Sequence, residues 1–472
     1  MSAASVSELL ARQKAAFTAA GPVSATVRRV RLQAVIDLLV RHHRALTDAM
    51  DADFGGRRRG YSMMNDILGP LSSLKHVRDH FEAWMPDEPR SAAPYEAIGG
   101  QAWVRYQPKG CVGIIGTWNA PLFTLLSPLA CALGAGNRAI LKPSEVVPRT
   151  GEVLAAAFAE MIDPLEVGVL LGGPDVAQAF TRQPFDHLVF TGSTAIGREV
   201  MRGAAEHLVP VTLELGGKSP TLVGRSADLG MTAFRLAAAK VTNGGQICVN
   251  PDVTYIPEDR LEAFIAAFRV AYEELLPTIR DNADVTAVVN PRHSSRVESY
   301  VADAAARGLR IESLSETVPA DDTENRRRGA RLVVNPGADA LIMQHEIFGP
   351  AMAIKTYHRI EEAVADINSR PRPLALYYFG TDEAEQAFVL DHTISGGVCI
   401  NEAMAHGGLH DAPFGGVGDA GMGHYHGREG FIEFSHLRTV YKASEIDPRK
   451  EWGMVPPYPE WLEGALEASI TP

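Results

Sequence analysis

The stretch from Cys111 to Gly217 decides the fold, because it contains five short apolar runs: CVGIIG (111–116), RAILK (138–142), VGVLLGG (167–173), HLVFTG (187–192) and VTLELGG (211–217). Continuous runs of this length are typical of strands that are buried on both faces of a sheet. Successive runs begin 20 to 29 residues apart, which leaves room for one crossover helix in each interval. The stretch therefore predicts a parallel, Rossmann-like sheet that binds a nucleotide.

The flanking sequence predicts more helices and a second α/β region. Before the first run, apolar residues recur at helical spacing from Ser7 to Met85, with Gly55-Gly56 as a stop. After the fifth run, strands are expected at 252–256, 331–334, 351–355, 374–379 and 397–400, and helices at 258–276, 294–307, 359–368 and 383–392. A hairpin is expected over 98–106, with its turn at Gly99-Gly100, and the tail after Tyr441 is Pro-rich and predicted to be irregular.

Length and charge exclude several classes of protein. A chain of 472 residues suggests two or three domains, and the formal net charge of −12 argues against nucleic acid or an anionic membrane as a partner. The four cysteines lie too far apart for a disulfide framework or a zinc motif, which favours a reducing compartment. Because Glu8 and Arg12 interrupt the N-terminal stretch, we expect no signal peptide and a cytoplasmic protein.

Three motifs contain side chains suited to catalysis. In NGGQIC (243–248) two glycines precede Cys248, which is either a reactive thiol in a cleft or an ordinary core cysteine. In VTLELGG, Glu214 lies among apolar residues, where burial raises a carboxyl pKa toward that of a general base, although backbone amides could equally satisfy it. In GTWNAP (116–121), Asn119 either donates to an oxyanion or completes a turn.

Two further motifs suit a dinucleotide. FTGSTAIG (190–197) passes from a strand through glycine into a helix, whose N-terminus favours phosphate, although the GxGxxG spacing is absent. LKPSE (141–145) puts a cation and a carboxylate after the second strand, where they either bind ribose hydroxyls or form a solvated salt-bridging loop. The histidines at 406, 410, 424 and 426 have glycines around them and no completing ligands, so we predict no metal site.

These motifs, together with EIFGP (346–350), resemble the aldehyde dehydrogenase superfamily, and they occur in that family's order along almost the whole chain. The run PFGGVGDAGMGHYHGREGFIEFSH (413–436) resembles the class 3 branch, particularly the bacterial coniferyl aldehyde dehydrogenase-like group. The resemblance implies an α/β fold with two Rossmann-related domains and a small β oligomerisation element. It also implies NAD(P)-dependent oxidation of an aldehyde, of aromatic or medium-chain aliphatic type, to the carboxylic acid.

The resemblance also implies roles for individual residues. Cys248 is the nucleophile, Asn119 and the Cys248 amide stabilise the oxyanion, and Glu214 is the general base. The residues implied for the cofactor, with NAD preferred over NADP, are Trp118, Lys142, Glu145, Gly192, Ser193, Gly197, Leu215, Gly216, Glu346 and Phe348. Two competing readings are a coenzyme A-acylating enzyme, which Glu214 argues against, and a catalytically idle binding or structural protein.

Ala120 departs from the family pattern, since relatives usually carry an aromatic residue after the Trp-Asn pair. The position is expected to line the substrate tunnel, so its truncation predicts space for a ring near the thiol.

The resemblance implies a division into parts and a homodimer. We expect an NAD-binding domain from 1–94 and 111–215, a catalytic domain from 216–412, an oligomerisation hairpin and strand at 95–110 and 435–446, and a C-terminal tail at 447–472.

Overall fold

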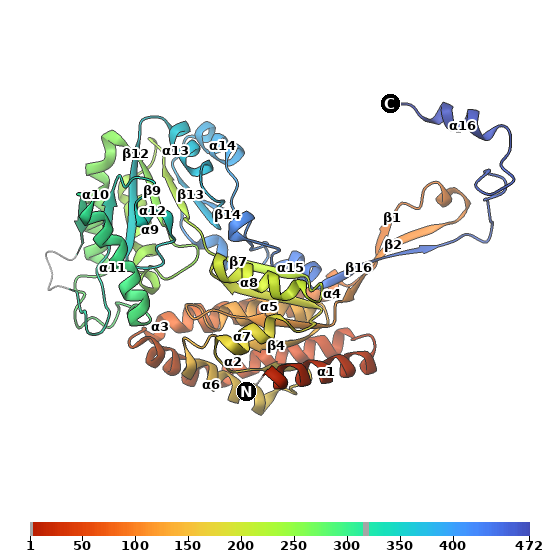
Figure 1. The fold of residues 1–472 in the computed structure, drawn as a ribbon, viewed down its shortest axis with the longest axis horizontal. Helices are drawn as coiled ribbons and strands as arrows, with labels where there is room; N and C mark the ends of the chain where they lie inside the picture. The colour runs from red at the N-terminus through yellow and green to blue at the C-terminus, as the bar shows by residue number, and fades with distance from the viewer. Residues whose placement is uncertain (1–2, 315–320) are drawn as a thin grey trace. The chain divides into compact units, whose positions relative to one another are not determined.

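The computed structural model describes residues 3–314 and 321–472, and these form two compact units. The larger unit comprises Met1–Trp84 and Pro108–Ser435, and the smaller one comprises Met85–Gln107 and His436–Pro472. Both large sheets and the N-terminal helices belong to the larger unit, as Figure 1 shows. The predicted α/β class is confirmed, whereas the expected domain boundaries inside the larger unit stay a prediction.

The Cys111–Gly217 stretch forms the core of a six-stranded sheet. Its strands, in their order across the sheet, are β15 (Gly421–Met422), β7 (Val211–Leu215), β6 (His187–Gly192), β3 (Cys111–Ile115), β4 (Arg138–Lys142) and β5 (Val167–Val169). All five predicted strands are present and mutually parallel, and only β15 is antiparallel to its neighbour. The chain proceeds outward from β3 to β5 and then resumes at β6 on the other side of β3. Ligands of such sheets bind where the strand order reverses, outside the carboxyl ends of the strands.

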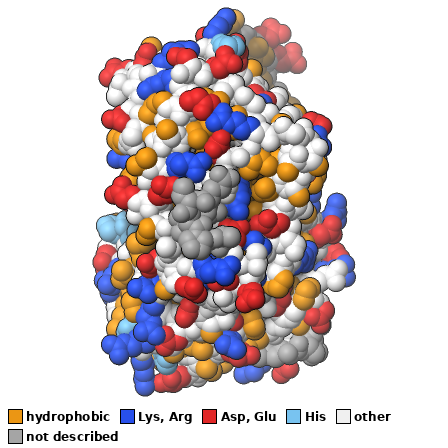
Figure 2. Space-filling model, turned by 90° about the vertical axis from the view of Figure 1, so that its left-hand side faces the viewer, with side chains coloured by type: hydrophobic (Ala, Val, Ile, Leu, Met, Phe, Trp, Pro, Cys, Tyr) orange, Lys and Arg blue, Asp and Glu red, His pale blue; other side chains and the backbone are white. Residues whose placement is uncertain are grey.

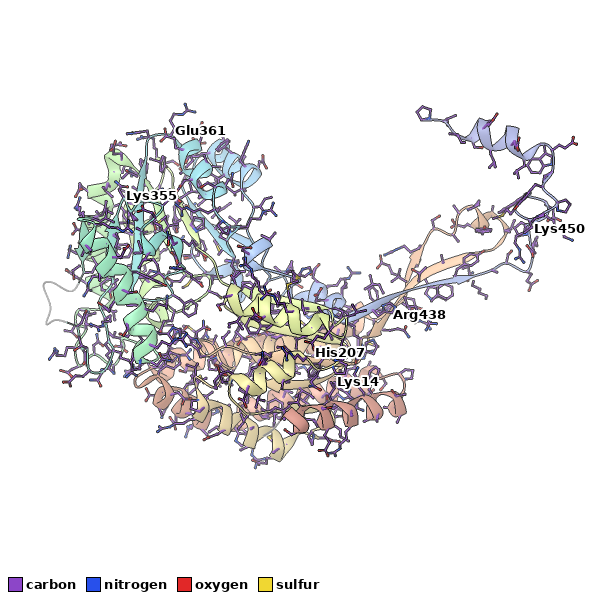
Figure 3. The ribbon with its side chains drawn as sticks, in the orientation of Figure 1. Lys14, His207, Lys355, Glu361, Arg438 and Lys450 are labelled. Carbon is purple, nitrogen blue, oxygen red and sulfur yellow. The ribbon has the colours of Figure 1, made fainter. Side chains whose placement is uncertain are left out.

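Helices cover both faces of this sheet. α5 (Phe123–Gly134) and α6 (Pro148–Met161) lie on one face with α2 (Ala25–Phe54) packed over them, while α1 (Ala3–Ala20), α7 (Pro174–Thr181) and α8 (Thr194–Ala205) contact one another on the other face. Lys14 of α1, labelled in Figure 3, pairs with Asp186 just before β6 at 3.0 Å. The sheet is therefore buried on both faces, which explains its uninterrupted apolar runs.

A seven-stranded sheet builds the other half of the larger unit. Its order is β10 (Ile311–Ser313), β11 (Arg331–Val334), β12 (Ala351–Tyr357), β9 (Val253–Pro257), β8 (Pro220–Val223), β13 (Ala375–Phe379) and β14 (Gly397–Ile400). Its helices are α9 (Leu229–Val241), α10 (Leu261–Leu275), α11 (Pro291–Ala306), α12 (Leu341–Gln344), α13 (Ile360–Asn368) and α14 (Glu383–His392). On the face drawn in Figure 2, acidic and basic side chains are interspersed.

The predicted strands and helices of this half match the structure to within a few residues, but the strands β8 and β10 and the helices α9 and α12 were missed. β8 is only four residues long and begins at a proline, which cannot donate to the sheet and therefore argues against a central strand. It nevertheless lies between β9 and β13.

The N-terminal helices are joined to the sheet by a buried ion pair. α2 ends at Gly55, whose φ of 69° confirms the predicted stop, and α3 (Arg59–Ser62), the π-helix η1 (Met63–Leu68) and α4 (Gly69–Trp84) follow as one helical segment. Arg57 donates to Asp66 at 2.6 Å, and both side chains are fully buried. Asp66 also accepts from the amides of Leu122 and Phe123, at 3.0 and 3.3 Å. The pair thus holds the turn that follows Asn119.

The hairpin prediction was wrong in its position. β2 (Gln101–Pro108) pairs antiparallel with β1 (Glu88–Arg90), and β16 (Ser435–Lys442) completes a three-stranded sheet. Gly99, with φ of 94°, ends the 3₁₀ helix η2 (Tyr95–Ile98), and a side chain at Gly100 would collide with Tyr95. The glycine pair therefore closes a helical turn instead of a hairpin turn.

The tail of the smaller unit was also predicted incorrectly, because it contains a helix. Arg438 on β16 and Lys450 in the tail are labelled in Figure 3, and α16 (Leu462–Ser469) follows them. Its sequence, LEGALEAS, is rich in the strong helix formers Leu, Ala and Glu. In the larger unit, α15 (Gly427–Glu433) precedes β16. Among the residues that the structure describes, no helix has the length and apolarity needed to cross a membrane.

The buried pair predicts a large stability effect. Asp66→Ala leaves the Arg57 guanidinium buried without its partner, so we expect a loss of about 3–5 kcal/mol in the free energy of unfolding, read from the urea midpoint. Asp48→Ala is the matched control, because it removes an exposed pair with Arg59 and should cost less than about 1 kcal/mol. Equal midpoints for the two variants would contradict the anchoring role of the buried pair.

Candidate active site

One cavity of about 1660 Å³ lies in the larger unit, where the ends of β3, β4, β6 and β7 face the second α/β half. It brings together most of the side chains singled out from the sequence. The predicted site residues that line it are Trp118, Asn119, Ala120, Lys142, Glu145, Gly192, Ser193, Glu214, Gly216, Cys248, Glu346 and Phe348. Motifs separated by more than 200 residues thus meet around one space.

Two predicted cofactor residues are not among those that line the cavity. Gly197, in the first turn of α8, and Leu215, at the end of β7, pack against each other, and a Cβ at Gly197 would lie 2.7 Å from the Leu215 side chain. The glycine lets α8 approach the sheet closely. Any effect of this pair on a cofactor is therefore exerted through the position of α8, and their assignment as cofactor residues stays a prediction.

The loop that carries Cys248 is held by backbone geometry and by Gln246. The 3₁₀ turn η3 (Thr242–Gly245) ends α9, and Gly245 has φ of 74° and no room for a Cβ beside the Gly349 carbonyl. Buried Gln246 donates to the carbonyls of Asn243 and Ala287 and accepts from the Val289 amide, at 2.8, 3.1 and 3.0 Å. The backbone on either side of Cys248 is therefore fixed, while its side chain is partly exposed to the cavity.

Asn119 lies against this loop. Its Nδ2 donates to the Gln246 carbonyl at 3.1 Å, and its Oδ1 accepts from the Thr117 hydroxyl at 2.6 Å. The Thr117 bond fixes the amide orientation, since an oxygen must face the hydroxyl donor. One Nδ2 hydrogen remains for a further acceptor near Cys248, as an oxyanion site requires.

The carboxylate of Glu214 is buried and lacks a hydrogen-bond partner in the described residues. The residue is 2% exposed, and neither carboxylate oxygen has a hydrogen-bond partner in the described part of the chain. Burial raises the pKa of Glu214 well above its ordinary value, the nearby Gly416 amide acts in the opposite direction, and the Glu433 carboxylate raises the pKa further. A carboxyl group in this environment gains a proton readily, which is the property of a general base.

Acidic neighbours keep the Cys248 thiol protonated. Burial, followed by the carboxylates of Glu346 and Glu214, raises the pKa of Cys248 to about 12. Burial and Asp252 raise the pKa of Glu346 to about 8. A positive charge bound in this cavity would lower the pKa of all three groups. Such a charge would therefore ease ionisation of the thiol.

The part of the cavity wall at the ends of the strands of the six-stranded sheet has groups that fit a nicotinamide dinucleotide. At the end of β4, Lys142 Nζ donates to Glu145 Oε2 at 3.1 Å, which places a cation and a carboxylate where ribose hydroxyls could bind. Ser193 caps the N-terminus of α8, whose free amides and dipole favour phosphate. These groups supply the donors and acceptors that the ends of a dinucleotide need.

The Glu346–Phe348 segment is clamped by a residue that the sequence did not single out. Arg296 of α11 donates to the carbonyls of Glu346, Ile347 and Phe348, at 3.1, 2.9 and 3.2 Å. Phe348 is held at φ of 46°, and its ring meets the Trp118 ring edge-on at 5.3 Å. Gly216 faces the Glu346 carboxylate so closely that a side chain there would collide with it.

An aromatic wall beside Ala120 was also missed. The cavity is lined there by Tyr61, Phe123, Phe414 and Tyr425. The Phe123 ring lies over Gly69, where a Cβ would be 2.8 Å from it, so the first residue of α4 makes room for the ring. Phe123 follows Ala120 by one helical turn, and this spacing is the signal that could have identified it.

Comparisons with known proteins agree with this geometry. The model of the "Aldehyde dehydrogenase family" matches residues 1–440. A "Probable coniferyl aldehyde dehydrogenase" of Caulobacter vibrioides is 45% identical over 98% of this chain and 96% of its own length. The substrate-bound state of Staphylococcus aureus AldH superimposes with a TM-score of 0.90 at 30% identity, covering 98% of this chain and 99% of that one. A Mycobacterium tuberculosis aldehyde dehydrogenase complexed with NAD+ gives 0.84 at 29% identity, covering 94% and 92% of the two chains.

The buried Glu214 carboxyl predicts that the stability of the folded protein decreases as pH rises. Because its folded pKa is raised, the folded state binds more protons than the unfolded state, and stability falls as pH rises above the unfolded value near 4.5. Glu214→Gln, which is neutral at every pH, should therefore raise the thermal midpoint relative to wild type at pH 8 and by much less at pH 4.5. The measurement is thermal unfolding of both proteins at the two pH values, and a midpoint difference independent of pH would refute it.

Proposed function

The chain belongs to the aldehyde dehydrogenase family, and we propose that it oxidises an aromatic aldehyde to the carboxylic acid with NAD as the preferred cofactor. The observation that carries the proposal is the meeting of Cys248, Glu214 and Asn119 in one cavity. The name of the Caulobacter relative supports the aromatic substrate class, and the NAD+ complex of the Mycobacterium enzyme supports the cofactor.

The first step joins the thiolate of Cys248 to the aldehyde carbonyl carbon. The carbonyl oxygen becomes negative and accepts hydrogen bonds from Asn119 Nδ2 and from the Cys248 backbone amide. The thiol loses its proton to Glu214, whose raised pKa suits it to accept one. The rigid Gln246 contacts keep the sulfur in attack geometry while the bond forms.

The cofactor site supplies the oxidant. A bound NAD would supply the hydride acceptor, so that the carbon attached to Cys248 would lose a hydride and remain on the sulfur as a thioester. Lys142 and Glu145 hold the adenosine ribose in this proposal, and Gly192 and Ser193 approach the pyrophosphate. Glu346 and Phe348, clamped by Arg296, position the nicotinamide ribose and ring. The Glu145 carboxylate favours NAD because it repels the 2′-phosphate of NADP.

The second half of the reaction is hydrolysis. Glu214 first releases to solvent the proton that it took from the thiol. It then takes a proton from a water molecule, whose oxygen bonds to the thioester carbon, and the carbon–sulfur bond breaks to release the acid and the Cys248 thiolate. The presence of this base argues against transfer to coenzyme A. The catalytically idle alternative is disfavoured because the three reacting side chains are present in one cavity.

We also propose a homodimer built on the smaller unit. That unit exposes apolar side chains of Leu437, Tyr441, Ile446, Tyr458 and Trp461, each at least 45% exposed, and such patches mark protein interfaces. Light scattering of the intact chain tests this, and a mass near the 50.9 kDa of one chain would contradict it. The cytoplasmic location expected from cysteine usage stays a prediction.

Removal of the nucleophile tests the proposed mechanism. Cys248→Ala should still bind NAD but lose aldehyde-dependent NADH formation by several orders of magnitude. The assay uses cinnamaldehyde-type and aliphatic substrates, NAD and NADP, with and without coenzyme A. Cys399→Ala, at a buried position on β14 that does not line the cavity, is the control and should retain activity. Substantial turnover by Cys248→Ala would contradict the thioester mechanism.

The side chain at position 120 is expected to determine how much space the cavity has for the aromatic ring of a substrate. Ala120→Tyr should lower kcat/KM for benzaldehyde and cinnamaldehyde about tenfold or more, roughly 1.4 kcal/mol, because the new ring occupies space beside Phe123. Acetaldehyde should be spared, and it serves as the internal control. An unchanged ratio between ring and short aldehydes would show that position 120 does not shape the tunnel.

A further inference from the structure

One helical face runs along the cavity wall away from the thiol. Tyr61, Asn65, Leu68, Gly69 and Ser72 line the cavity from the continuous segment α3–η1–α4, at spacings that place them on one side of the helix. Tyr61 begins this face, in the cavity that Cys248 also lines. Ser72 follows about three helical turns later. The wall therefore leads from the reacting sulfur to a polar end.

His410 closes this polar end from the other side of the cavity. Its Nδ1 lies 3.0 Å from the hydroxyl of Ser73, which itself lies 3.1 Å from the hydroxyl of Ser127. The imidazole also meets the His426 ring at 5.7 Å in an edge-to-face arrangement. These contacts fix the orientation of a ring that comes from the loop between η5 (Ala405–Gly408) and β15.

The remaining nitrogen of His410 is available to a ligand. No hydrogen bond to Nε2 occurs within residues 3–314 and 321–472, and the side chain borders the cavity. Burial and the neighbouring His76 lower the pKa of His410, so the ring is neutral at pH 7. A neutral imidazole whose Nδ1 is engaged by Ser73 presents at Nε2 either one donor or one acceptor, depending on the tautomer. A phenolic hydroxyl can complement both.

We propose that His410, oriented by Ser73, binds the ring hydroxyl of a hydroxylated aromatic aldehyde and makes the tunnel selective for phenolic over unsubstituted rings. The inference rests on the proposed function. In it, the carbonyl of the aldehyde substrate meets Cys248, and the aromatic ring of the substrate occupies the space beside Ala120, Tyr61 and Phe123. A site built to hydrogen-bond a hydroxyl rejects the analogue that lacks it, because the polar group is then left unpaired. Substrates with a hydroxyl para to the aldehyde-bearing chain place it farthest from the thiol, toward His410.

The test compares 4-hydroxy-3-methoxycinnamaldehyde with cinnamaldehyde. His410→Phe keeps a ring of similar shape but removes the hydrogen bond, so kcat/KM for the phenolic substrate should fall about tenfold. The loss should appear mainly in KM, because a contact at the far end of the ring is the same before and during reaction. Cinnamaldehyde should keep or gain activity, because the variant leaves no unpaired imidazole beside its ring. His410→Gln, whose amide retains hydrogen-bonding capacity, should restore part of the phenolic preference.

A matched control distinguishes binding from folding. His406→Phe makes the same chemical change four residues earlier, where the imidazole contacts Cys399 Sγ at 3.1 Å and does not line the cavity. It should alter both substrates equally. Ser73→Ala frees Nδ1 of His410 and should reduce the phenolic preference by a smaller factor than His410→Phe.

The outcomes separate this assignment from the function on which it rests. If wild type oxidises neither aldehyde, the proposed function fails and this inference fails with it. If wild type oxidises both but His410→Phe leaves their ratio unchanged, or lowers both equally, the assignment of His410 is wrong while the proposed function stands. A selective loss for the phenolic substrate supports both.

Discussion

The buried pair of Arg57 and Asp66 is the constraint on which the site depends. It joins the end of α2 to the π-helix η1, and the second oxygen of Asp66 reaches the amides of Leu122 and Phe123. The Arg57 guanidinium also lies 4.8 Å from the centres of both the Phe54 and Tyr61 rings. Two charges removed from water are tolerated when they are paired with each other and hydrogen-bonded, as the Arg57–Asp66 contact and the two amides at Asp66 provide here. As a result, the end of α2, η1 and the turn that follows Asn119 are held together.

A second constraint is electrostatic, because two carboxyl groups lie near the Cys248 thiol. Cys248, Glu214 and Glu346 are each desolvated, and the carboxylates of Glu346 and Glu214 further raise the cost of ionising the Cys248 thiol. The thiol is therefore protected from ionisation until positive charge enters the cavity. The same burial that suppresses the thiolate makes Glu214 a competent base. In the proposed mechanism, one physical effect thus disfavours ionisation of the nucleophile and prepares the group that deprotonates it.

The part of the cavity proposed to bind the substrate ring is lined by segments that lie far apart in the sequence. The helical face from Tyr61 to Ser72 precedes the first strand of the nucleotide-binding sheet, whereas His410, Phe414 and Tyr425 come from the other end of the chain. The π-turn of η1 lies within that face, and such insertions are frequent at functional sites. Apolar and aromatic surface lies near Ala120 and polar groups lie farther out, an order that matches an aldehyde whose ring carries a polar substituent.

The sequence by itself determined the parallel strands of the six-stranded sheet, since runs buried on both faces must be continuously apolar, and it singled out Cys248, Glu214 and Asn119, whose catalytic roles stay a prediction. It did not determine β8, because a strand that begins at Pro220 lacks a local signal, or the hairpin, because Gly99-Gly100 suits more than one kind of turn. Only the tertiary structure decided that Arg57 meets Asp66 in a dry interior and that His410 and Tyr61 line the same cavity. Such contacts depend on how separate elements pack in space, and periodicity records only which side of each element is buried.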